Sequence, residues 1–425
     1  MTAGTVDLEA IAARASAEVD EAAVREALEV LTATPSPWGA ERALAEHVAA
    51  WGRRRYGEVE WEIDALSDAS ANLFARSALG DARELVVSGH LDTSLSGTAA
   101  DAAITGVTTA PPPLSYDARA IRGFGVGVAK GPSAAGLVGF AHAAAALRAN
   151  RVPHRLTLLL AAGGTHRAPA SDERTRFGRG VTHALERGWR PAAVLNVKGG
   201  PAGVVFEEPA AAYVRVRLRR RWAAALARRK VAPDGGLARH AGAVLDAIEK
   251  WRERFVDSRG QLASEVAIGA IASGSPAKPD LLPGVLDVHL YVMHQPEQDA
   301  DAVARDLHAA LAAVVAALPG APQLTVDVTA RAPGGRADPA ADVVRLANDA
   351  RSRFLGAAPP VREWTGATDG ALFLAAGVPT ARFGPNVTRD DSDPRVEIVS
   401  LDELLAASRA YVDVAVRYFG AASRA

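Results

Sequence analysis

The chain has 425 residues, a length that suits two domains better than one simple core. Hydrophobic residues make up 49% and charged residues 23%, and the formal net charge of −1 offers no field that would attract nucleic acid or an anionic membrane. Cysteine is absent, so disulfides, thiolate nucleophiles and cysteine-ligated zinc are excluded. The N-terminal segment carries acidic residues where a secretory signal needs basic ones, and no run of about 18 apolar residues occurs. We therefore expect a cytoplasmic protein with no nucleic-acid or membrane partner.

Helix-like and strand-like segments alternate along residues 1–208. Apolar residues recur at helical spacing in the longer segments, whereas some shorter ones are continuously apolar, as in strands buried on both faces. The alternation predicts an α/β sheet covered by helices. The predicted elements are helices at 5–33 and 39–54, strands at 59–63, 72–75 and 84–88, a helix at 133–147, a strand at 156–161, a helix at 180–186 and a strand at 193–197.

A different pattern begins near residue 209 and ends at a linker-like Ala-Pro-Gly-Gly stretch, 332–335. Its order is βαββαβ, the split arrangement of a small ferredoxin-like domain. Because the earlier alternation then resumes, we predict one domain built from 1–208 and 332–425, with a second domain, 209–331, inserted into it. The inserted elements are predicted at 211–219, 237–255, 263–272, 284–293, 298–317 and 323–329.

A His-x-Asp motif, His90-Leu91-Asp92, follows the strand ELVVSG. Open α/β sheets place their ligand sites at the carboxyl ends of strands. Imidazole can bind a metal there, and a nearby carboxylate can orient it. Alone, the motif equally suits a His and an Asp that hydrogen-bond a turn.

The segment VVSGHLDT resembles the first metal motif of the carboxypeptidase G, acetylornithine deacetylase and succinyl-diaminopimelate desuccinylase family of dizinc amidohydrolases. The resemblance continues through RGFGVGVAKGP, LTLLLAAGGT, AAVLNVKGG, GATD, RFGPN and the last helical segment, and so covers nearly the whole chain. It implies a mixed sheet sandwiched by helices and an inserted lid or dimerisation domain, hence a homodimer. It also implies two zinc ions bridged by a carboxylate, with a glutamate as base.

The metal ligands carry over poorly from the resemblance. His90 and Asp92 match the first ligand and its supporting carboxylate. The bridging aspartate, however, corresponds to Val128, which cannot bind a metal. A further carboxylate ligand corresponds to Lys198, whose ammonium would repel a divalent cation.

The remaining ligand positions also lack the expected side chains, and the lid segment 219–236 has no histidine where the family points one at a partner subunit. The residues found are Gly164 and Thr165 for the paired glutamates, or His166 and Arg167 after a shift of one or two residues, and Asp390 or Asp391 for the last histidine. The sequence therefore predicts no zinc and no other cofactor. If a metal binds, the candidate ligands are His90, Asp92 and Asp390.

The catalytic candidates are His90, Asp92, Lys198 and His166. We predict that Lys198 takes the electrostatic place of the metal, with its ammonium paired to Asp92 near His90. Lysine is scarce, yet Lys130 and Lys198 both fall in segments expected to line the cleft. The alternative is that each is a partly exposed lysine paired with any nearby carboxylate. His166 is a candidate general base, because imidazole titrates near neutrality, or else a polar loop residue.

Four residues are candidates for substrate binding: Lys130, His294, Thr368 and Asp369. His294 falls where the family often has an arginine that holds a substrate carboxylate, although a surface histidine at a strand end would look the same. Asp369 is either a site residue or a helix N-cap. The Gly-rich run at 123–131 could present backbone N–H groups to an anion.

Three functions fit these residues. The leading prediction is a divergent amidohydrolase-like or peptidase-like protein that acts on an amino-acid-derived or peptide-like small molecule by metal-independent chemistry. The second is a catalytically inactive homologue that binds a small molecule or serves as a partner subunit. The third is an active zinc-dependent deacylase or dipeptidase with atypical ligands. Fold alone does not decide among these functions, so the choice must rest on the residues found in place of the metal ligands.

Overall fold

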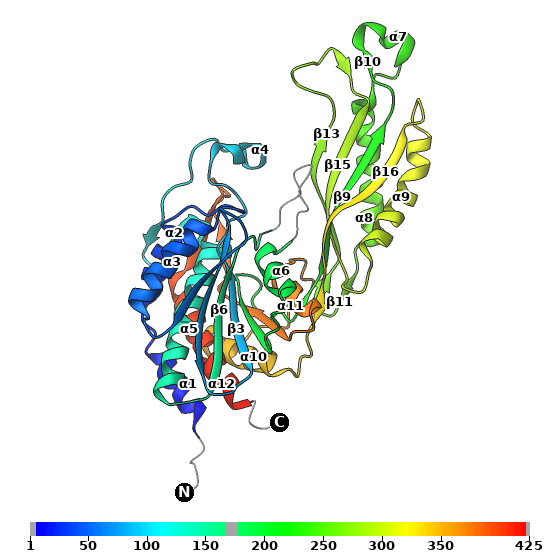
Figure 1. Ribbon diagram of the computed structural model, residues 1–425. Coiled ribbons are helices and arrows are strands. Elements are labelled where there is room, and N and C mark those ends of the chain that lie inside the picture. The colour runs from blue at the N-terminus through cyan, green and yellow to red at the C-terminus, as the bar shows by residue number, and fades with distance from the viewer. Residues whose placement is uncertain (1–5, 166–176, 422–425) are drawn as a thin grey trace.

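The computed structural model describes residues 6–165 and 177–421, and the structural statements below concern these residues. A mixed six-stranded sheet forms the centre of the larger domain (Figure 1). In spatial order its strands are β1 (Glu60–Ala65), β2 (Ala71–Leu79), β6 (His154–Ala161), β3 (Glu84–His90), β7 (Ala193–Val197) and β18 (Thr380–Phe383). The last four are parallel to one another, whereas β1 and β2 are antiparallel to their neighbours.

Helices cover both faces of this sheet, as predicted. One face carries α1 (Leu8–Ala17), α2 (Glu21–Thr32), α3 (Arg42–Arg55), α5 (Gly131–Ala149), α10 (Asp342–Leu355) and α12 (Leu401–Ala421), and the other carries α6 (Arg179–Glu186) and α11 (Gly370–Ala375). Leu85 and Val87 of β3 join the large core with α5 and α12. Val86, between them, joins a smaller core with Phe373 of α11. This two-sided cover explains the continuously apolar sequence of the central strands.

Two helices replace the single helical pattern predicted at 5–33. Asp20 lies between α1 and α2, and its carboxylate accepts a hydrogen bond from the backbone N–H of Ala23, so it caps the start of α2. The other elements predicted for the first 208 residues are present, with ends that differ by a few residues.

The inserted domain has the predicted βαββαβ order. Its elements are β9 (Ala210–Arg219), α8 (Ala241–Phe255), β13 (Glu265–Ala272), β15 (Val285–His294), α9 (Ala300–Ala316) and β16 (Gln323–Ala332). The strands form an antiparallel sheet in the order β13-β15-β9-β16. Trp251 of α8 and Leu307 of α9 pack with Val288 of β15 in a core separate from that of the larger domain.

The two chain segments that connect the domains lie side by side. The strand β8 (Glu207–Glu208) leads out of the larger domain, β17 (Gly335–Arg336) leads back, and the two pair antiparallel. The stretch predicted as a linker therefore ends in a two-stranded ribbon. In Figure 1 the inserted domain extends away from the larger domain on the far side of this ribbon. We propose that the domains divide here, at the predicted limits of 208 and 332.

A four-stranded sheet that the sequence did not predict lies beside the Gly-rich turn. In spatial order its strands are β19 (Val387–Arg389), β20 (Val396–Ser400), β5 (Ala120–Phe124) and β4 (Ser115–Asp117). After β5 the chain makes one π-helical turn, Val126–Lys130, that leads directly into α5. The short helix α4 (Ala102–Thr105) stands out from the larger domain (Figure 1).

Candidate functional site

His90 ends β3, and its surroundings fix both ring nitrogens. Nδ1 lies 3.1 Å from the Asp92 carboxylate oxygen Oδ1 and 3.1 Å from the Asp92 backbone oxygen. Since both neighbours accept hydrogen bonds, Nδ1 carries the proton and Nε2 keeps its lone pair. Nε2 is buried without a hydrogen-bond partner. Burial and the charge of Lys198 lower the pKa of His90, so the ring is neutral.

Asp92 is held as a carboxylate. It accepts hydrogen bonds from the backbone N–H groups of Gly164, at 2.7 Å, and Thr165, at 2.8 Å, and from the Thr165 hydroxyl. Burial alone would raise the pKa of Asp92, but His90 and these hydrogen bonds outweigh it and hold the pKa well below its usual range. Asp92 therefore orients His90 and supports a positive charge on it.

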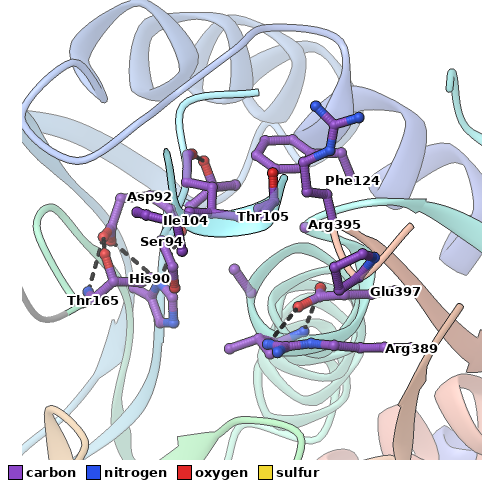
Figure 2. A pocket seen from close by; sticks show the side chains of 16 residues that line it. His90, Asp92, Ser94, Ile104, Thr105, Phe124, Thr165, Arg389, Arg395 and Glu397 are labelled. Atoms are coloured by element: carbon purple, nitrogen blue, oxygen red, sulfur yellow. Dashed lines mark hydrogen bonds and ion pairs between the residues drawn. The ribbon is translucent and has the colours of Figure 1, made fainter. Parts of the chain in front are cut away.

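A cavity of about 350 Å³ opens beside this pair. Figure 2 shows His90, Asp92 and Thr165 on one side of it and Arg389, Arg395 and Glu397 on the other. The remaining lining residues are mostly apolar or hydroxyl-bearing, and they come from the segment after β3, from α4, from the end of β5 and the π-helical turn, and from the loop between β19 and β20. They are Thr93, Ser94, Leu95, Ile104, Thr105, Phe124, Gly125, Val128, Ala129 and Pro394.

Lys198 and Asp369 are both buried, and each is the strongest source of electrostatic attraction for the other. Asp369 is the main source of attraction for Lys198, and burial nevertheless lowers the pKa of Lys198. Burial likewise raises the pKa of Asp369 to about 7 despite the Lys198 charge. Asp92, the predicted partner of Lys198, is hydrogen-bonded to His90 instead and attracts Lys198 more weakly than Asp369 does.

Gly164 separates His90 from Asp369. A Cβ atom on Gly164 would lie 2.5 Å from Cβ of His90 and 2.6 Å from Oδ2 of Asp369. The site therefore leaves no room for a side chain at Gly164. Asp369 does not act as an N-cap through its side chain, and its Oδ1 is buried without a partner.

A buried polar network that the sequence analysis missed continues from Asp369 toward the inserted domain. The Thr368 hydroxyl donates to Glu208 at 2.7 Å and accepts from the Asn196 amide at 3.2 Å. Arg382 lies over the Trp364 ring at 4.4 Å and donates to a backbone carbonyl, while its Nε and Nη1 have no partner. Thr368 is thus placed next to the site but is engaged by Glu208.

Lys130 is also buried, so the alternative of partly exposed lysines is wrong for both residues: the exposed fractions are 3% for Lys130 and 9% for Lys198. The Lys130 ammonium donates to the backbone oxygen of Leu91 at 2.5 Å and to the Ser36 hydroxyl. Burial lowers the pKa of Lys130 to about 7. Lys130 does not line the cavity. Its hydrogen bond to Leu91 instead stabilises the backbone next to Asp92.

The Gly-rich turn before α5 binds a carboxylate of the chain itself. Oε2 of Glu397, on β20, accepts hydrogen bonds from the backbone N–H of Gly127 at 2.8 Å and of Val128 at 3.0 Å. The predicted anion-binding N–H groups exist but are occupied by Glu397. Both Glu397 and Val128 line the cavity.

His294 and Asp390, like Lys130, do not line the cavity. His294 is buried rather than on the surface, with Nδ1 3.0 Å from the Gln295 backbone oxygen and Nε2 unpartnered. Asp390 pairs with Arg122 and accepts from Ser392, which lowers the pKa of Asp390 to about 2. His166 lies outside the described residues.

These side chains do not fit a dinuclear metal centre. Within residues 6–165 and 177–421, no group of three or more His, Cys, Asp or Glu residues is placed to hold a metal ion. His90 offers one free nitrogen, but the oxygens of Asp92 are already engaged by four donors. Val128, at the cavity wall, has no ligand atom in its side chain, and the buried ammonium of Lys198 would repel a divalent cation.

The whole chain nevertheless has the fold of the two-domain M20 metallopeptidases and related amidases, which confirms the predicted scaffold. A solved aminopeptidase PepT from Bacillus cereus matches with a TM-score of 0.65 at 16% identity, covering 94% of this chain and 98% of its own. A dinuclear metal-binding M20 peptidase from Bacillus subtilis matches at 0.61 and 14%, covering 94% and 98%. Human carnosine dipeptidase 1 matches at 0.64 and 14%, covering 97% and 100%. No protein-family model and no curated protein matches the sequence.

Proposed function

We propose that this amidohydrolase-like protein hydrolyses an amide bond in an amino-acid-derived or peptide-like small molecule, and that it does so without a resident metal. The observation that carries the proposal is the state of His90. Asp92 fixes Nδ1, while Nε2 belongs to a neutral ring at the cavity wall and has no partner in the protein. An imidazole held in this way is suited to accept a proton from a bound water.

In the proposed reaction, the oxygen of a water molecule bonds to the amide carbonyl carbon while its proton passes to Nε2 of His90. The carboxylate of Asp92 stabilises the resulting imidazolium, in the manner of the Asp-His pair of serine hydrolases. The C–N bond then breaks, and the proton passes from Nε2 to the leaving nitrogen. The products are a carboxylic acid and an amine, and no oxidant or reductant is needed.

We further propose that Lys198 and Asp369 tune the charge state of His90 without contacting the substrate. Burial lowers the pKa of His90 most, and the charge of Lys198 adds to this effect, so that the ring is neutral before the substrate binds. Asp369, with its pKa near neutrality, accompanies Lys198 and limits the buried positive charge. Lys130 and Thr368 then support the site, because their own hydrogen bonds turn them toward the protein.

The test is hydrolysis of N-acetyl amino acids and dipeptides in the presence of a strong metal chelator. We expect turnover by the natural protein and a loss on the order of 10²- to 10⁴-fold in His90→Ala. His47→Ala, which changes an exposed histidine on α3, serves as the control and should leave the rate unchanged. Activity that disappears with the chelator and returns with zinc, or that survives His90→Ala, contradicts the proposal.

A second candidate function is binding without turnover, and Val128 favours it. This apolar side chain and the internally bonded Glu397 stand where the family has its bridging ligand. Saturable binding of the same compounds, with no product detected after prolonged incubation, would select this function over hydrolysis.

A further inference from the structure

We propose that a second cavity, at the junction of the two domains, binds a small phosphate ester with an apolar body. The cavity has a volume of about 420 Å³ and shares no lining residue with the cavity at His90. It lies between α10, the segment 203–207 that leads to the inserted domain, and the turn between β11 (Ser258–Arg259) and β12 (Leu262–Ala263). In Figure 1, β11 lies at the end of the inserted domain that is nearest the larger domain.

Arg351 of α10 lines this cavity as a buried cation without a carboxylate partner. Its exposed fraction is 8%. Among the described residues its guanidinium makes one hydrogen bond, from Nη1 to the Gly356 backbone oxygen, and no ion pair. A guanidinium has five N–H donors, and leaving a buried charge unpaired is costly. Most of the donors of Arg351 are therefore left for a ligand that enters the cavity.

Further polar groups line the cavity beside Arg351. Asn348 and Ser352 are three and four residues apart from each other and from Arg351 along α10 or directly adjacent to it, so they share its part of the helix surface. Arg362, from the loop after α10, is exposed and makes no ion pair within the described residues. One arginine can satisfy a carboxylate with two hydrogen bonds, whereas two guanidinium groups and a hydroxyl suit a phosphate dianion.

Glu207 is the one carboxylate among the lining residues, and the protein already engages it. Its Oε2 accepts a hydrogen bond from the backbone N–H of Gln261 at 2.9 Å and lies 3.4 Å from Nε of Arg336. It therefore leaves the two lining arginines unpaired. Much of the remaining wall is apolar and suits an apolar or aromatic ester group; it is formed by Val204, Phe206, Pro359, Pro360 and Val361.

The cavity is held in shape by Gln261, which belongs to the inserted domain. The Gln261 side-chain oxygen accepts a hydrogen bond from the backbone N–H of Phe206 at 2.9 Å, and its amide donates to the Val204 backbone oxygen at 2.9 Å. A preformed cavity of this size is typical of small-molecule sites. A ligand bound here contacts both domains and stabilises their arrangement, independently of the reaction proposed at His90.

The experiment measures binding of phenyl phosphate, inorganic phosphate and phenol to the full chain by titration calorimetry. We expect phenyl phosphate to bind more tightly than either of the other two probes. Arg351→Gln should weaken its binding by roughly 10- to 100-fold, as for lost hydrogen bonds to a charged group. Arg362→Gln changes an exposed side chain that folding does not need, and it should weaken binding by about 2- to 5-fold.

Arg345→Gln is the matched control, because it changes an exposed arginine of α10 that pairs with Asp342, and it should leave binding unchanged. His90→Ala should also bind phenyl phosphate like the natural protein; a loss there would place the probe in the cavity at His90 and overturn the inference. No binding by the natural protein, or equal binding by the natural protein, Arg351→Gln and Arg362→Gln, would overturn it too. None of these results bears on hydrolysis at His90, which is measured separately.

Discussion

At the scale of single residues, the buried carboxyl group of Asp369 makes the stability of the protein depend on pH. Burial raises the pKa of Asp369 to about 7, against an ordinary value of 3.8. Between pH 4 and 7 the folded protein therefore binds more protons than the unfolded chain, and this group lowers the free energy of unfolding as the pH rises. The contribution is fully lost above pH 7.

Asp369→Asn tests this expectation, because asparagine mimics the protonated acid. Relative to the natural protein, we expect the variant to be nearly equal in stability near pH 3 and more stable at pH 8, by on the order of 4 kcal/mol. Urea unfolding of both proteins at several pH values measures this difference. The lowered pKa of His90 has the opposite effect, because it adds stability as the pH rises toward 6.5. His90 is present in both proteins, so its contribution cancels in the difference. A difference that does not change with pH would show that Asp369 is ionised throughout.

The sequence named candidate residues both near His90 and far from it, but it predicted only the local contact between His90 and Asp92. His90 and Asp92 are two residues apart, so one motif contains the dyad. The approach of Asp369 to Gly164 depends on how two turns pack, which no local spacing reports. Glu397 did carry a signal, since it stands between apolar residues in the strand VEIVS and is buried there, but its partners lie 270 and 269 residues away.

At the scale of elements, the turn after β6 lets His90 and Asp369 approach each other closely, because Gly164 between them has no side chain. We expect Gly164→Ala to destabilise the protein by about 1–3 kcal/mol, because its Cβ would overlap His90 and Asp369. Chemical denaturation measures the change. Gly242→Ala is the matched control: Gly242 lies in α8, where an added Cβ atom would have open space around it, so the variant should gain about 0.5–1 kcal/mol. Equal effects at both positions would refute the crowding at Gly164.

The elements predicted from sequence are those with a strong pattern of their own. The apolar strands β3 and β6 and the helices of the inserted domain were found, because burial on one or both faces leaves a periodic signature. The sheet of β4, β5, β19 and β20 was not found. Its strands are three to five residues long and come from segments far apart in the chain, so only tertiary pairing defines them.

At the scale of the whole molecule, an open sheet edge supports the proposed homodimer through the inserted domain. β13 is an edge strand, and its last four residues are all exposed, with Ile271 49% exposed. Such edges pair readily with another chain. We expect a solution mass of twice 44.1 kDa by light scattering. Ile271→Asp should shift it to the monomer, and Leu79→Asp, on the larger domain, should not. A monomeric natural protein would rule the dimer out.

The central claim is that an M20-type fold has exchanged its dinuclear centre for the His90–Asp92 pair backed by Lys198. Zinc content measures it most directly. The purified protein is incubated with excess zinc, desalted and analysed for zinc per chain, beside His90→Ala treated in the same way. We predict far less than one bound zinc per chain, and no difference between the two proteins. About two zinc ions per chain in the natural protein, lost in His90→Ala, would contradict the account.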